Sequence, residues 1–231
     1  MKNKMLKQKL EQVFSEIKYG NDLGEPIYLV GATKMVDASV INKAIEYGLK
    51  IVGENKVQEF REKHLDIVGA EQHFIGHLQT NKVKYLVGNV SLIQSVDSVK
   101  LSAEIDKQAK KKNLVQDVLI EVNIGGELSK SGFNLEDAFT NVLSISKEFS
   151  NVKVVGLMAM LPHSDDHEYL IGLCKKMRAL FDALKEKGLP FKYLSMGMSS
   201  DYLIAIKNGS NMIRLGRTIF GQRLYQNKKE N

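Results

Sequence analysis

The stretch IYLVGATK, residues 27–34, decides the fold of this chain of 231 residues. It is a short apolar run that ends in a lysine, and a helix-start sequence, VDAS, follows almost at once. Runs of this kind, bounded by turn and cap residues, predict buried parallel strands of an α/β protein. Because side chains alternate along a strand, Val30, Ala32 and Lys34 should share one face, with Leu29 on the opposite face.

Lys34 is unusual because it shares a face with apolar residues. Ammonium groups are rarely buried without a partner, and burial favours the neutral amine, which can attack a carbonyl carbon. We therefore predict that Lys34 is a nucleophile. The alternative is that Lys34 lies past the end of the strand in solvent, and the stretch by itself favours this alternative. The rest of the chain has to decide between the two.

Length and composition are typical of one domain with a sizeable core. Hydrophobic residues make up 43% of the chain, and α/β barrels commonly reach this length as a single domain. The single cysteine, Cys174, excludes an internal disulfide and favours a reducing compartment. No apolar run approaches the ~20 residues that span a bilayer, and the amphipathic N-terminus contains no signal-peptide core. We expect a cytoplasmic protein without a membrane partner.

The net charge of +6 is compatible with nucleic-acid binding, but its distribution argues against it. Much of the excess lies in the first ten residues, at 110–112 and at 227–231, without interleaved aromatic residues. Solvated helix faces and termini explain these charges more simply. We therefore expect no nucleic-acid partner.

Eight strand-like runs alternate with helical patterns along the chain. Strict alternation predicts a parallel sheet with right-handed crossovers. This number of units fits a closed (β/α)8 TIM barrel better than an open sheet. The strand-like runs begin near residues 27, 50, 72, 91, 116, 152, 192 and 211. The helical patterns cover residues 38–48, 56–68, 79–87, 98–112, 135–149, 167–187 and 200–208.

We expect residues 1–231 to form a single α/β domain. An extra N-terminal helix within residues 1–22 should cover the bottom or the outer wall of the barrel. Residues 27–221 should form the barrel itself, and residues 222–231 a basic tail. Helix-capping residues and glycines at the expected helix ends support this division.

Two loops after the last two strands indicate a phosphate site. Residues 195–201, SMGMSSD, and residues 214–221, RLGRTIFG, each run from a strand into a helix through glycine and hydroxyl residues. Backbone N–H groups at such turns bind anions, and barrels frequently hold a phosphate between these two loops. Either loop alone favours ordinary helix capping, whereas the two together favour a phosphate.

A phosphate opposite an inward-facing lysine indicates a phosphorylated aldehyde. Pyridoxal 5'-phosphate (PLP) is the common cofactor with these properties, and it forms a Schiff base with a lysine amine. Alternation along the last strand places Arg214 on one face with Met212 and Gly216. Because arginine is always protonated, it can only donate a hydrogen bond to the pyridine nitrogen. That nitrogen then stays unprotonated, which weakens the ring as an electron sink.

Several segments together resemble a known family. The chain contains, in the family's order, GATKMVDASVINKAIEYG, VGENKVQEF, HFIGHLQTNK, VLIEVNIGGELSKSGF, VVGLMAM, LSMGMSSD and MIRLGRTIFG. These segments look like the pyridoxal phosphate homeostasis proteins, whose fold resembles the N-terminal barrel of alanine racemase. The resemblance extends over residues 27–221. It implies a single-domain barrel that binds PLP covalently and helps to control its supply, without an established catalytic reaction.

The resemblance also implies which residues surround the cofactor ring. Lys34 would be the Schiff-base lysine, and Arg214 would face the pyridine nitrogen. Asn55 would line the ring pocket, as would Met158 and Ser195.

The phosphate would be held by Ser199, by Gly216 and by the backbone amides of Arg217 and Thr218. Many relatives have a small hydroxyl residue at the position of Arg217. Arg217 therefore either contacts the phosphate through its backbone alone or adds a charge, and the sequence leaves both open.

Other polar residues have simpler explanations. His77 and Asn81 fit helix capping and loop packing at least as well as cofactor contact. Glu54 points away from the ring pocket and is expected to be structural. Lys130 could help to receive or release the cofactor, although an exposed lysine is the commoner case. The stretch HSDDH at 163–167 resembles a metal cluster, but no fixed ligand spacing recurs, so we expect no metal.

These residues favour a cofactor carrier over an enzyme. Lys34 would capture PLP and release it to other proteins, with PLP-dependent apo-enzymes as candidate recipients. The first alternative is an amino-acid racemase, which needs acid/base groups on both faces of the ring; alanine racemase draws one of them from a second domain and a partner subunit. The second alternative is a barrel for another phosphorylated metabolite, with Lys34 as a simple cation. We expect a monomer.

Overall fold

The structure of the protein, a computed structural model, describes residues 2–127 and 130–221. The basic tail expected at 222–231 lies outside the described residues. Within the described ranges, no helix combines the length and the apolar character that crossing a membrane requires.

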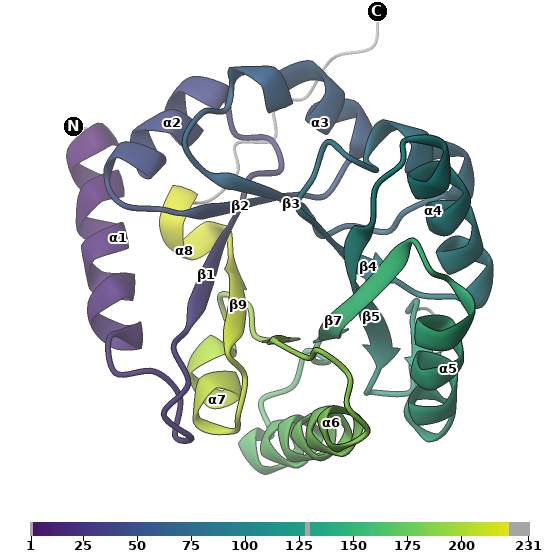
Figure 1. The fold of residues 1–231 in the computed structure, drawn as a ribbon. Coiled ribbons are helices and arrows are strands. Elements are labelled where there is room, and N and C mark those ends of the chain that lie inside the picture. Colours follow the sequence, from purple (N-terminus) through teal and green to yellow (C-terminus); the bar gives the residue numbers. More distant parts are fainter. Residues whose placement is uncertain (1, 128–129, 222–231) are drawn as a thin grey trace, which may run out of the picture.

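Eight parallel strands close into a barrel surrounded by helices (Figure 1). The strand order is β4-β3-β2-β1-β9-β8-β7-β5, and the pairing of β4 with β5 closes the ring. The expected (β/α)8 barrel is thereby confirmed. The strands are β1 (Tyr28–Ala32), β2 (Ile51–Glu54), β3 (Glu71–Phe74), β4 (Leu92–Val96), β5 (Gln116–Asn123), β7 (Val152–Ala159), β8 (Tyr193–Ser195) and β9 (Met212–Leu215).

A further strand of two residues, β6 (Phe133–Asn134), was not predicted from the sequence. It pairs in parallel with the end of β5, through Val122 and Asn123. So short a strand shows no alternation that a sequence pattern could reveal.

The two faces of β1 separate as alternation predicts. Val30 belongs to an apolar cluster inside the barrel, whereas Leu29 packs outward against the helices. Burying a side chain of this kind contributes about 1.5–3 kcal/mol, so the filled interior is a packed core rather than a pore. The buried residues of this inner cluster are Val30, Ile51, Ile75, Leu92, Leu119, Val155, Met158 and Met212.

The helices follow the expected segments, with two local differences. The pattern at 56–68 divides into α3 and a 3-10 turn, and the pattern at 79–87 forms a 3-10 helix instead of an α-helix. Short segments close few i to i+4 hydrogen bonds, which favours the tighter form. The helices are α2 (Ala38–Glu46), α3 (Val57–Lys63), η1 (His64–Asp66), η2 (Thr80–Tyr85), α4 (Val99–Lys111), α5 (Leu135–Glu148), α6 (His167–Glu186), α7 (Tyr202–Lys207) and α8 (Arg217–Phe220).

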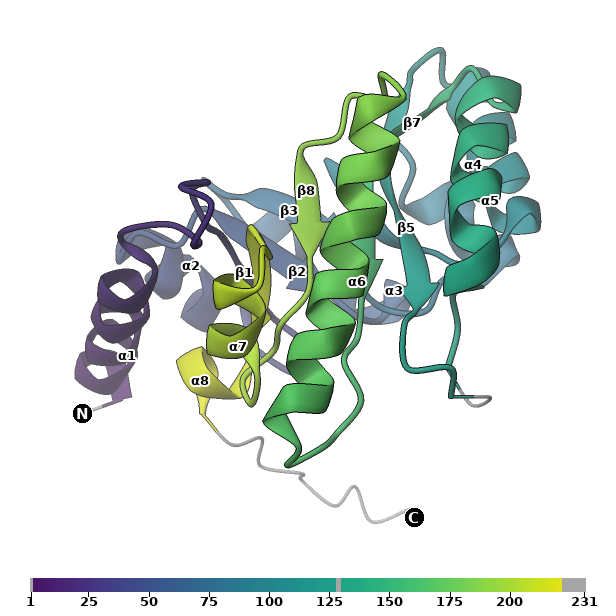
Figure 2. The ribbon, with the colours of Figure 1, turned by 90° about the horizontal axis from the view of Figure 1, so that it is seen from below.

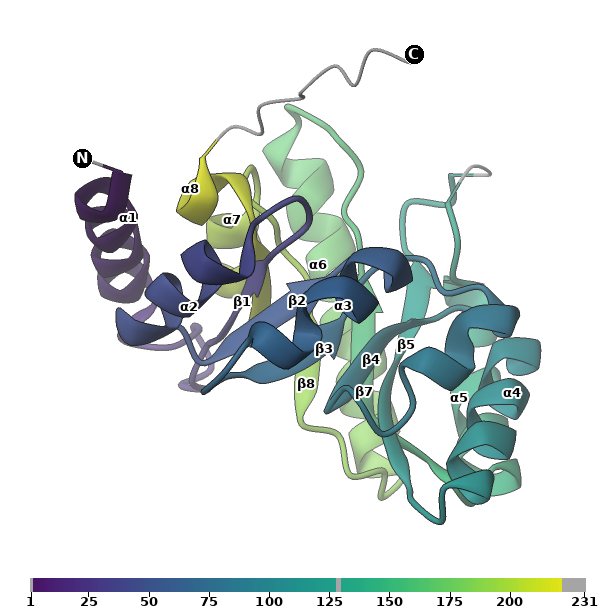
Figure 3. The same cartoon turned by 90° about the horizontal axis from the view of Figure 1, so that it is seen from above.

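The N-terminal helix α1 (Lys2–Ile17) covers the outer wall of the barrel. It lies at one side of the molecule, next to α2 and α8 (Figures 2 and 3). Its apolar face, formed by Leu6, Leu10 and Val13, belongs to the cluster that packs on the outside of β1 and β9. Of the two positions that the sequence left open for this helix, the structure therefore shows the outer wall.

The helix ends five residues before the expected limit at residue 22, because a turn stabilised by Asn21 follows it. The Asn21 side-chain oxygen accepts hydrogen bonds from the backbone N–H groups of Leu23 at 3.0 Å and Glu25 at 2.9 Å. Gly20 has φ +81°, a conformation that glycine adopts without strain.

Candidate functional site

A cavity of about 710 Å³ opens at the C-terminal ends of the barrel strands. We call it the Lys34 cavity. Its wall comes from the ends of six strands and the loops that follow them, which is where TIM barrels carry their functional residues. The residues that line it are Ala32, Lys34, Asn55, Ile75, Met160, Met198, Ser199, Ser200, Arg214, Gly216 and Arg217.

Lys34 is half-buried in this wall. The expectation that the strand itself ends in Lys34 is wrong, because β1 ends at Ala32 and Lys34 lies in the turn that follows. The side chain is not in bulk solvent there, since it lines the same cavity as the glycine and serine loops. The same cavity contains Ser199, Arg214 and Gly216, so the structure brings together residues that are up to 182 positions apart in the chain. These four predicted residues therefore line one cavity.

Buried polar groups fix the backbone just before Lys34. The Thr33 amide donates to the Gly53 carbonyl at 2.9 Å, and the Thr33 hydroxyl donates to the Glu54 carboxylate at 3.1 Å. That carboxylate also forms an ion pair with Lys63 at 2.5 Å, and the Lys63 amine donates to the Thr33 carbonyl at 2.8 Å. The expectation that Glu54 has a structural role agrees with these contacts.

The residue after Lys34 is held as well. Met35 has φ +59°, and its amide donates to the Glu59 carboxylate at 2.7 Å. A left-handed backbone conformation costs free energy at a non-glycine residue, so the surrounding contacts must hold the residue there. The Lys34 side chain therefore starts from a backbone position that is anchored on both sides.

Arg214 is buried beneath the cavity, with 5% of its surface exposed. Its Nη1 donates to the Ser195 carbonyl at 2.9 Å and to the Ser195 hydroxyl at 2.6 Å, and its Nη2 donates to the Ala159 carbonyl at 2.9 Å. Burial lowers the pKa of Arg214 to about 10, against the opposing effect of Glu121 and Asp201. The guanidinium therefore stays charged at neutral pH, and it can only donate hydrogen bonds.

The two glycine and serine loops contact each other at the edge of the cavity. The Ser199 hydroxyl accepts a hydrogen bond from the Thr218 amide at 3.4 Å, and the Arg214 amide donates to the Gly197 carbonyl at 3.0 Å. Gly197 has φ +103°, and a Cβ there would come within 2.9 Å of Ala205 Cβ. Only glycine fits this turn, which keeps the two loops in register.

The remaining predicted residues occupy different positions. Asn55 lines the cavity, and Arg217 lines it with an exposed side chain at its rim. Met158 is buried in the inner cluster, and Ser195 is fully buried next to Arg214. Thr218 is half-buried and is not among the lining residues.

The sequence assigned no individual role to several lining residues, namely Ala32, Ile75, Met160, Met198 and Ser200. Of these, Met198 and Ser200 belong to the loop 195–201 in which a phosphate site was expected. Alternation offered a signal for two of the others. Ala32 shares the inner face of β1 with Val30, and Met160 lies two residues after the inward-facing Met158. Met160 reaches the cavity because it follows the last residue of β7.

Glu121 is a further polar group near the site that the sequence analysis overlooked. It is buried, and burial with the nearby Asp97 raises its pKa to about 7, against the opposing effect of Arg214 and His77. A signal was present, because Glu121 lies two positions after the inward-facing Leu119. A carboxyl group on the inner face of a barrel strand stands out from its apolar neighbours.

The other polar candidates lie away from the Lys34 cavity. His77 is exposed and contacts Asp97 at 3.2 Å and the Ser131 hydroxyl at 3.2 Å. Lys130 forms an ion pair with Glu127. Across residues 2–127 and 130–221, no group of histidine, cysteine and acidic side chains has the geometry of a metal site, and the stretch 163–167 is no exception.

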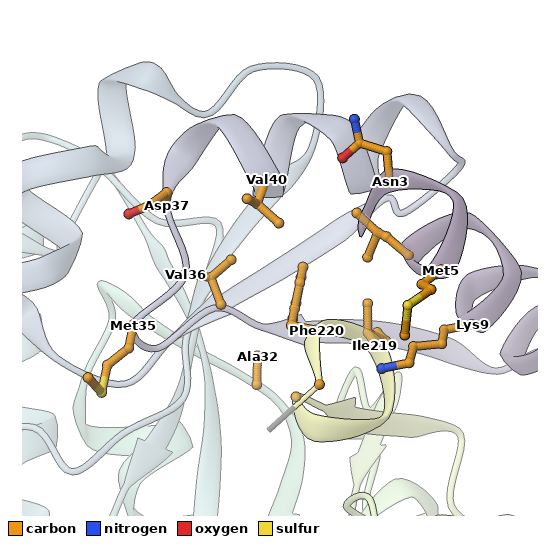
Figure 4. A pocket seen from close by; sticks show the side chains of 13 residues that line it. Asn3, Met5, Lys9, Ala32, Met35, Val36, Asp37, Val40, Ile219 and Phe220 are labelled. Atoms are coloured by element: carbon orange, nitrogen blue, oxygen red, sulfur yellow. The ribbon is translucent and has the colours of Figure 1, made fainter. Parts of the chain in front are cut away.

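A second cavity, of about 480 Å³, lies between α1, the loop after β1 and α8. It shares Ala32 and Gly216 with the Lys34 cavity, but Lys34 and Arg214 do not line it. Figure 4 shows mostly apolar side chains, among them Ile219 and Phe220, with the Lys9 amine beside them. The chemistry that the sequence predicted therefore belongs to the Lys34 cavity.

Comparison with known proteins identifies the family. A family model described as "Alanine racemase, N-terminal domain" matches residues 32–224. The pyridoxal phosphate homeostasis protein of Aquifex aeolicus is 47% identical over 203 residues, which are 85% of this chain and 87% of the relative. The protein of the same name from Escherichia coli is 33% identical over 209 residues, 88% of this chain and 89% of the relative.

Solved structures agree with these matches. PipY of Synechococcus elongatus, solved with PLP bound, has a TM-score of 0.81 and 27% identity, and the match covers 94% of this chain and all of PipY. Alanine racemase of Clostridium difficile has a TM-score of 0.79 but 15% identity, and the match covers 96% of this chain and 58% of the racemase. The racemase comparison shows a common fold. Together with the sequence matches, these structures show that the chain belongs to the alanine racemase N-terminal domain family and, within it, to the pyridoxal phosphate homeostasis proteins.

Proposed function

We propose that the protein binds PLP in the Lys34 cavity, holds it as a Schiff base on Lys34, and releases it to PLP-dependent apo-enzymes. The observation that carries the proposal is that one cavity joins the Lys34 amine, the Arg214 guanidinium and the loops of Ser199 and Gly216. These groups match three of the polar parts of PLP, namely its aldehyde, its pyridine nitrogen and its phosphate. The names of the relatives and the PLP in PipY support the assignment.

Lys34 supplies the covalent attachment. Its amine would add to the aldehyde carbon of a bound PLP, with loss of one water molecule to the solvent. The hydrogen bonds of Thr33 and Met35 hold the backbone on either side of Lys34, which limits the positions that its amine can reach. Fixing a nucleophile in this way lowers the entropy cost of the reaction.

Arg214 would face the pyridine nitrogen as a hydrogen-bond donor. Its Nε–H and one Nη2–H make no hydrogen bond to the described part of the chain, and the residue lines the cavity. Because the guanidinium is itself charged, it disfavours protonation of the nitrogen it faces. An unprotonated ring stabilises carbanions poorly. This property suits a protein that binds PLP better than an enzyme that uses PLP in catalysis.

Ser199, Gly216 and the backbone amides of Arg217 and Thr218 would hold the phosphate. Gly216 lets the backbone come close to the phosphate oxygens. The exposed Arg217 side chain at the rim adds a positive charge on the solvent side.

Asn55, which lines the cavity, would contact the ring. Met158 and Ser195 act from beneath the cavity, Met158 by packing in the inner cluster and Ser195 through its hydrogen bonds with Arg214.

Holding PLP without turnover is part of the proposal. Racemisation needs an acid/base group on each face of the ring. Lys34 provides one, and in the described ranges no tyrosine, histidine or carboxylate lines the cavity to provide the other. The common fold with alanine racemase makes a racemase the alternative function.

The proposal treats residues 1–231 as one domain that acts as a monomer in the cytoplasm. The single cysteine supports a reducing compartment. Cys174 is buried, and burial raises the pKa of its thiol to about 12. A thiol in this state is unreactive toward oxidants.

Absorbance spectroscopy tests the covalent attachment. Protein loaded with PLP is expected to show a visible band at about 420 nm, and Lys34→Ala should remove it. Lys9→Ala, which changes the amine of the second cavity, is the matched control and should leave the band unchanged. Borohydride reduction followed by peptide mass mapping should place the modified residue at position 34. A full band in the Lys34→Ala protein would contradict the assignment.

Two assays separate the carrier from the racemase. Mixing the loaded protein with a PLP-dependent apo-enzyme should restore the activity of that enzyme and remove the visible band from the carrier. Incubation with L- and D-amino acids should give no sustained interconversion. Racemisation at enzyme-like rates, lost in the Lys34→Ala protein, would favour the alternative.

A further inference from the structure

A chain of buried polar side chains runs from Arg214 into the interior of the barrel. The Ser195 hydroxyl, which accepts from Arg214, donates to the Gln94 side-chain carbonyl at 2.7 Å. The Gln94 amide lies 3.0 Å from Nδ1 of His73, and Nε2 of His73 lies 3.6 Å from the Glu71 carboxylate. The chain therefore links four barrel strands, from β9 through β8 and β4 to β3.

These side chains are removed from solvent. Ser195 and Gln94 are 0% exposed, and His73 is 2% exposed. Buried polar groups of this kind are costly unless each of them is paired. Their neighbours inside the barrel are apolar. One of them is Leu92, which lies two residues before Gln94 on the same face of β4. Packing alone would favour a hydrophobic side chain at position 94.

The direction of every hydrogen bond follows from Arg214. Arginine can only donate, so the Ser195 hydroxyl accepts from it and sends its single proton to Gln94. The Gln94 carbonyl is then committed to Ser195, and its NH2 group points to His73 and to the Met212 sulfur at 3.3 Å. Nδ1 of His73 must accept, which leaves the proton on Nε2.

The ionisation of His73 agrees with this order. Burial lowers the pKa of His73, against the opposing effect of Glu71. The imidazole is therefore neutral at physiological pH, as an acceptor at Nδ1 requires.

We propose that Gln94 and His73 are positioning residues that hold Ser195 and Arg214 in the orientation needed at the pyridine nitrogen. The inference rests on the proposed PLP site and extends it to two side chains that do not line the cavity. The Ser195 hydroxyl is one of three anchors of the guanidinium. Because that hydroxyl donates its proton to Gln94, its lone pairs are free to accept the hydrogen bond from Arg214.

The test uses the full chain loaded with PLP and two readouts, the dissociation constant for PLP and the pH midpoint of the visible band. Gln94→Met keeps the size of the side chain and removes its hydrogen bonds. We expect PLP binding to weaken about 3- to 10-fold, the value of one hydrogen bond, and the pH midpoint to shift. A purely structural role would lower the thermal stability and move neither readout.

Two further variants test whether the effect passes along the chain. His73→Leu removes the acceptor for the Gln94 amide, whereas His73→Asn keeps an acceptor in a similar place. We expect the pH midpoint to shift in His73→Leu and to return toward the wild-type value in His73→Asn. In a Ser195→Ala background, Gln94→Met should add no further shift, because its effect passes through Ser195.

Gln116→Met is the matched control, since Gln116 is also a buried glutamine, with hydrogen bonds to backbone at the N-terminal end of β5. It should leave both readouts unchanged. Wild-type values in a folded Gln94→Met protein, or equal shifts in Gln116→Met, would overturn the inference. If Gln94→Met does not fold, the inference is tested by the two His73 variants, and an unchanged pH midpoint in His73→Leu would overturn it. A wild-type protein without any visible band would instead reject the proposed PLP site.

Discussion

At the scale of single residues, the protein tolerates buried polar groups where they hold the Lys34 cavity in shape. Glu54 is 4% exposed and accepts hydrogen bonds from Thr33 and from the amides of Asn55 and Lys56, besides its ion pair with Lys63. These contacts join the ends of β1 and β2, which carry Lys34 and Asn55. A buried carboxylate with this many partners is stable where an unpaired one would not be.

Glu121 is a buried carboxyl group whose raised pKa gives a pH-dependent prediction. Its pKa is raised to about 7 in the folded protein by burial and by Asp97, whereas an unfolded chain has the ordinary value. The folded state therefore binds the proton more tightly, and the stability from this group is complete below the unfolded pKa and is lost as the pH rises through 7.

The substitution Glu121→Gln removes this titration. Between pH 4.5 and pH 8, the free energy of unfolding of Glu121→Gln relative to wild type should rise by on the order of 3 kcal/mol. Urea denaturation of both proteins at several pH values measures the difference. Glu62→Gln, at an exposed position of α3, is the control and should show no such trend. A constant difference between Glu121→Gln and wild type across this range would show that Glu121 does not titrate there.

At the scale of secondary-structure elements, the strands were easier to predict than the short helices. Each of the eight predicted strands is present, because apolar runs such as residues 116–123 are long enough to show a pattern. The 3-10 helix η2 and the two-residue strand β6 are too short for one. Helix α1 was predicted from its amphipathic pattern, but a pattern shows which face is apolar and not what that face contacts.

Leu10 tests the contact of α1 with the barrel wall. It is 0% exposed and packs in the cluster with Leu29, Ile41 and Ile213. Leu10→Ala should lower the free energy of unfolding by about 2–5 kcal/mol, through lost burial and the cavity left behind. Urea denaturation followed by circular dichroism measures the loss. Met5→Ala, at a position with 56% exposure on the same helix, should change stability by less than about 0.5 kcal/mol. Equal effects of the two substitutions would show that α1 does not pack in this way.

At the scale of the whole molecule, the closed barrel is what makes the cavity a single site. β1, the strand that precedes Lys34, pairs with β9, and β9 pairs with β8, so the three strands that lead to Lys34 and to the two glycine and serine loops are consecutive in the barrel. The register places Val30 opposite Arg214. Residues from the beginning and the end of the chain therefore form one binding site only in the folded state.

Binding at such a site stabilises the whole fold by mass action. At a PLP concentration 100 times the dissociation constant, the free energy of unfolding should rise by about 2.7 kcal/mol. The shift of the urea midpoint with PLP concentration measures this effect. In Lys34→Ala the shift should need much higher PLP concentrations, because the covalent bond is lost. An unchanged midpoint in wild type at all PLP concentrations would contradict specific binding to the folded state.

The sequence by itself determined the barrel and the inward face of β1, since alternation is a local pattern. The chemistry of the site is a prediction from strand-end motifs. Tertiary structure decided which side chains meet. Local spacing does not show that Gln94 and His73 support Arg214, that Glu121 approaches Arg214, or that Met160 and not Met158 reaches the cavity. The physical reason is that a local pattern gives the direction of a side chain relative to its own strand, whereas contacts across the barrel depend on strand register and closure.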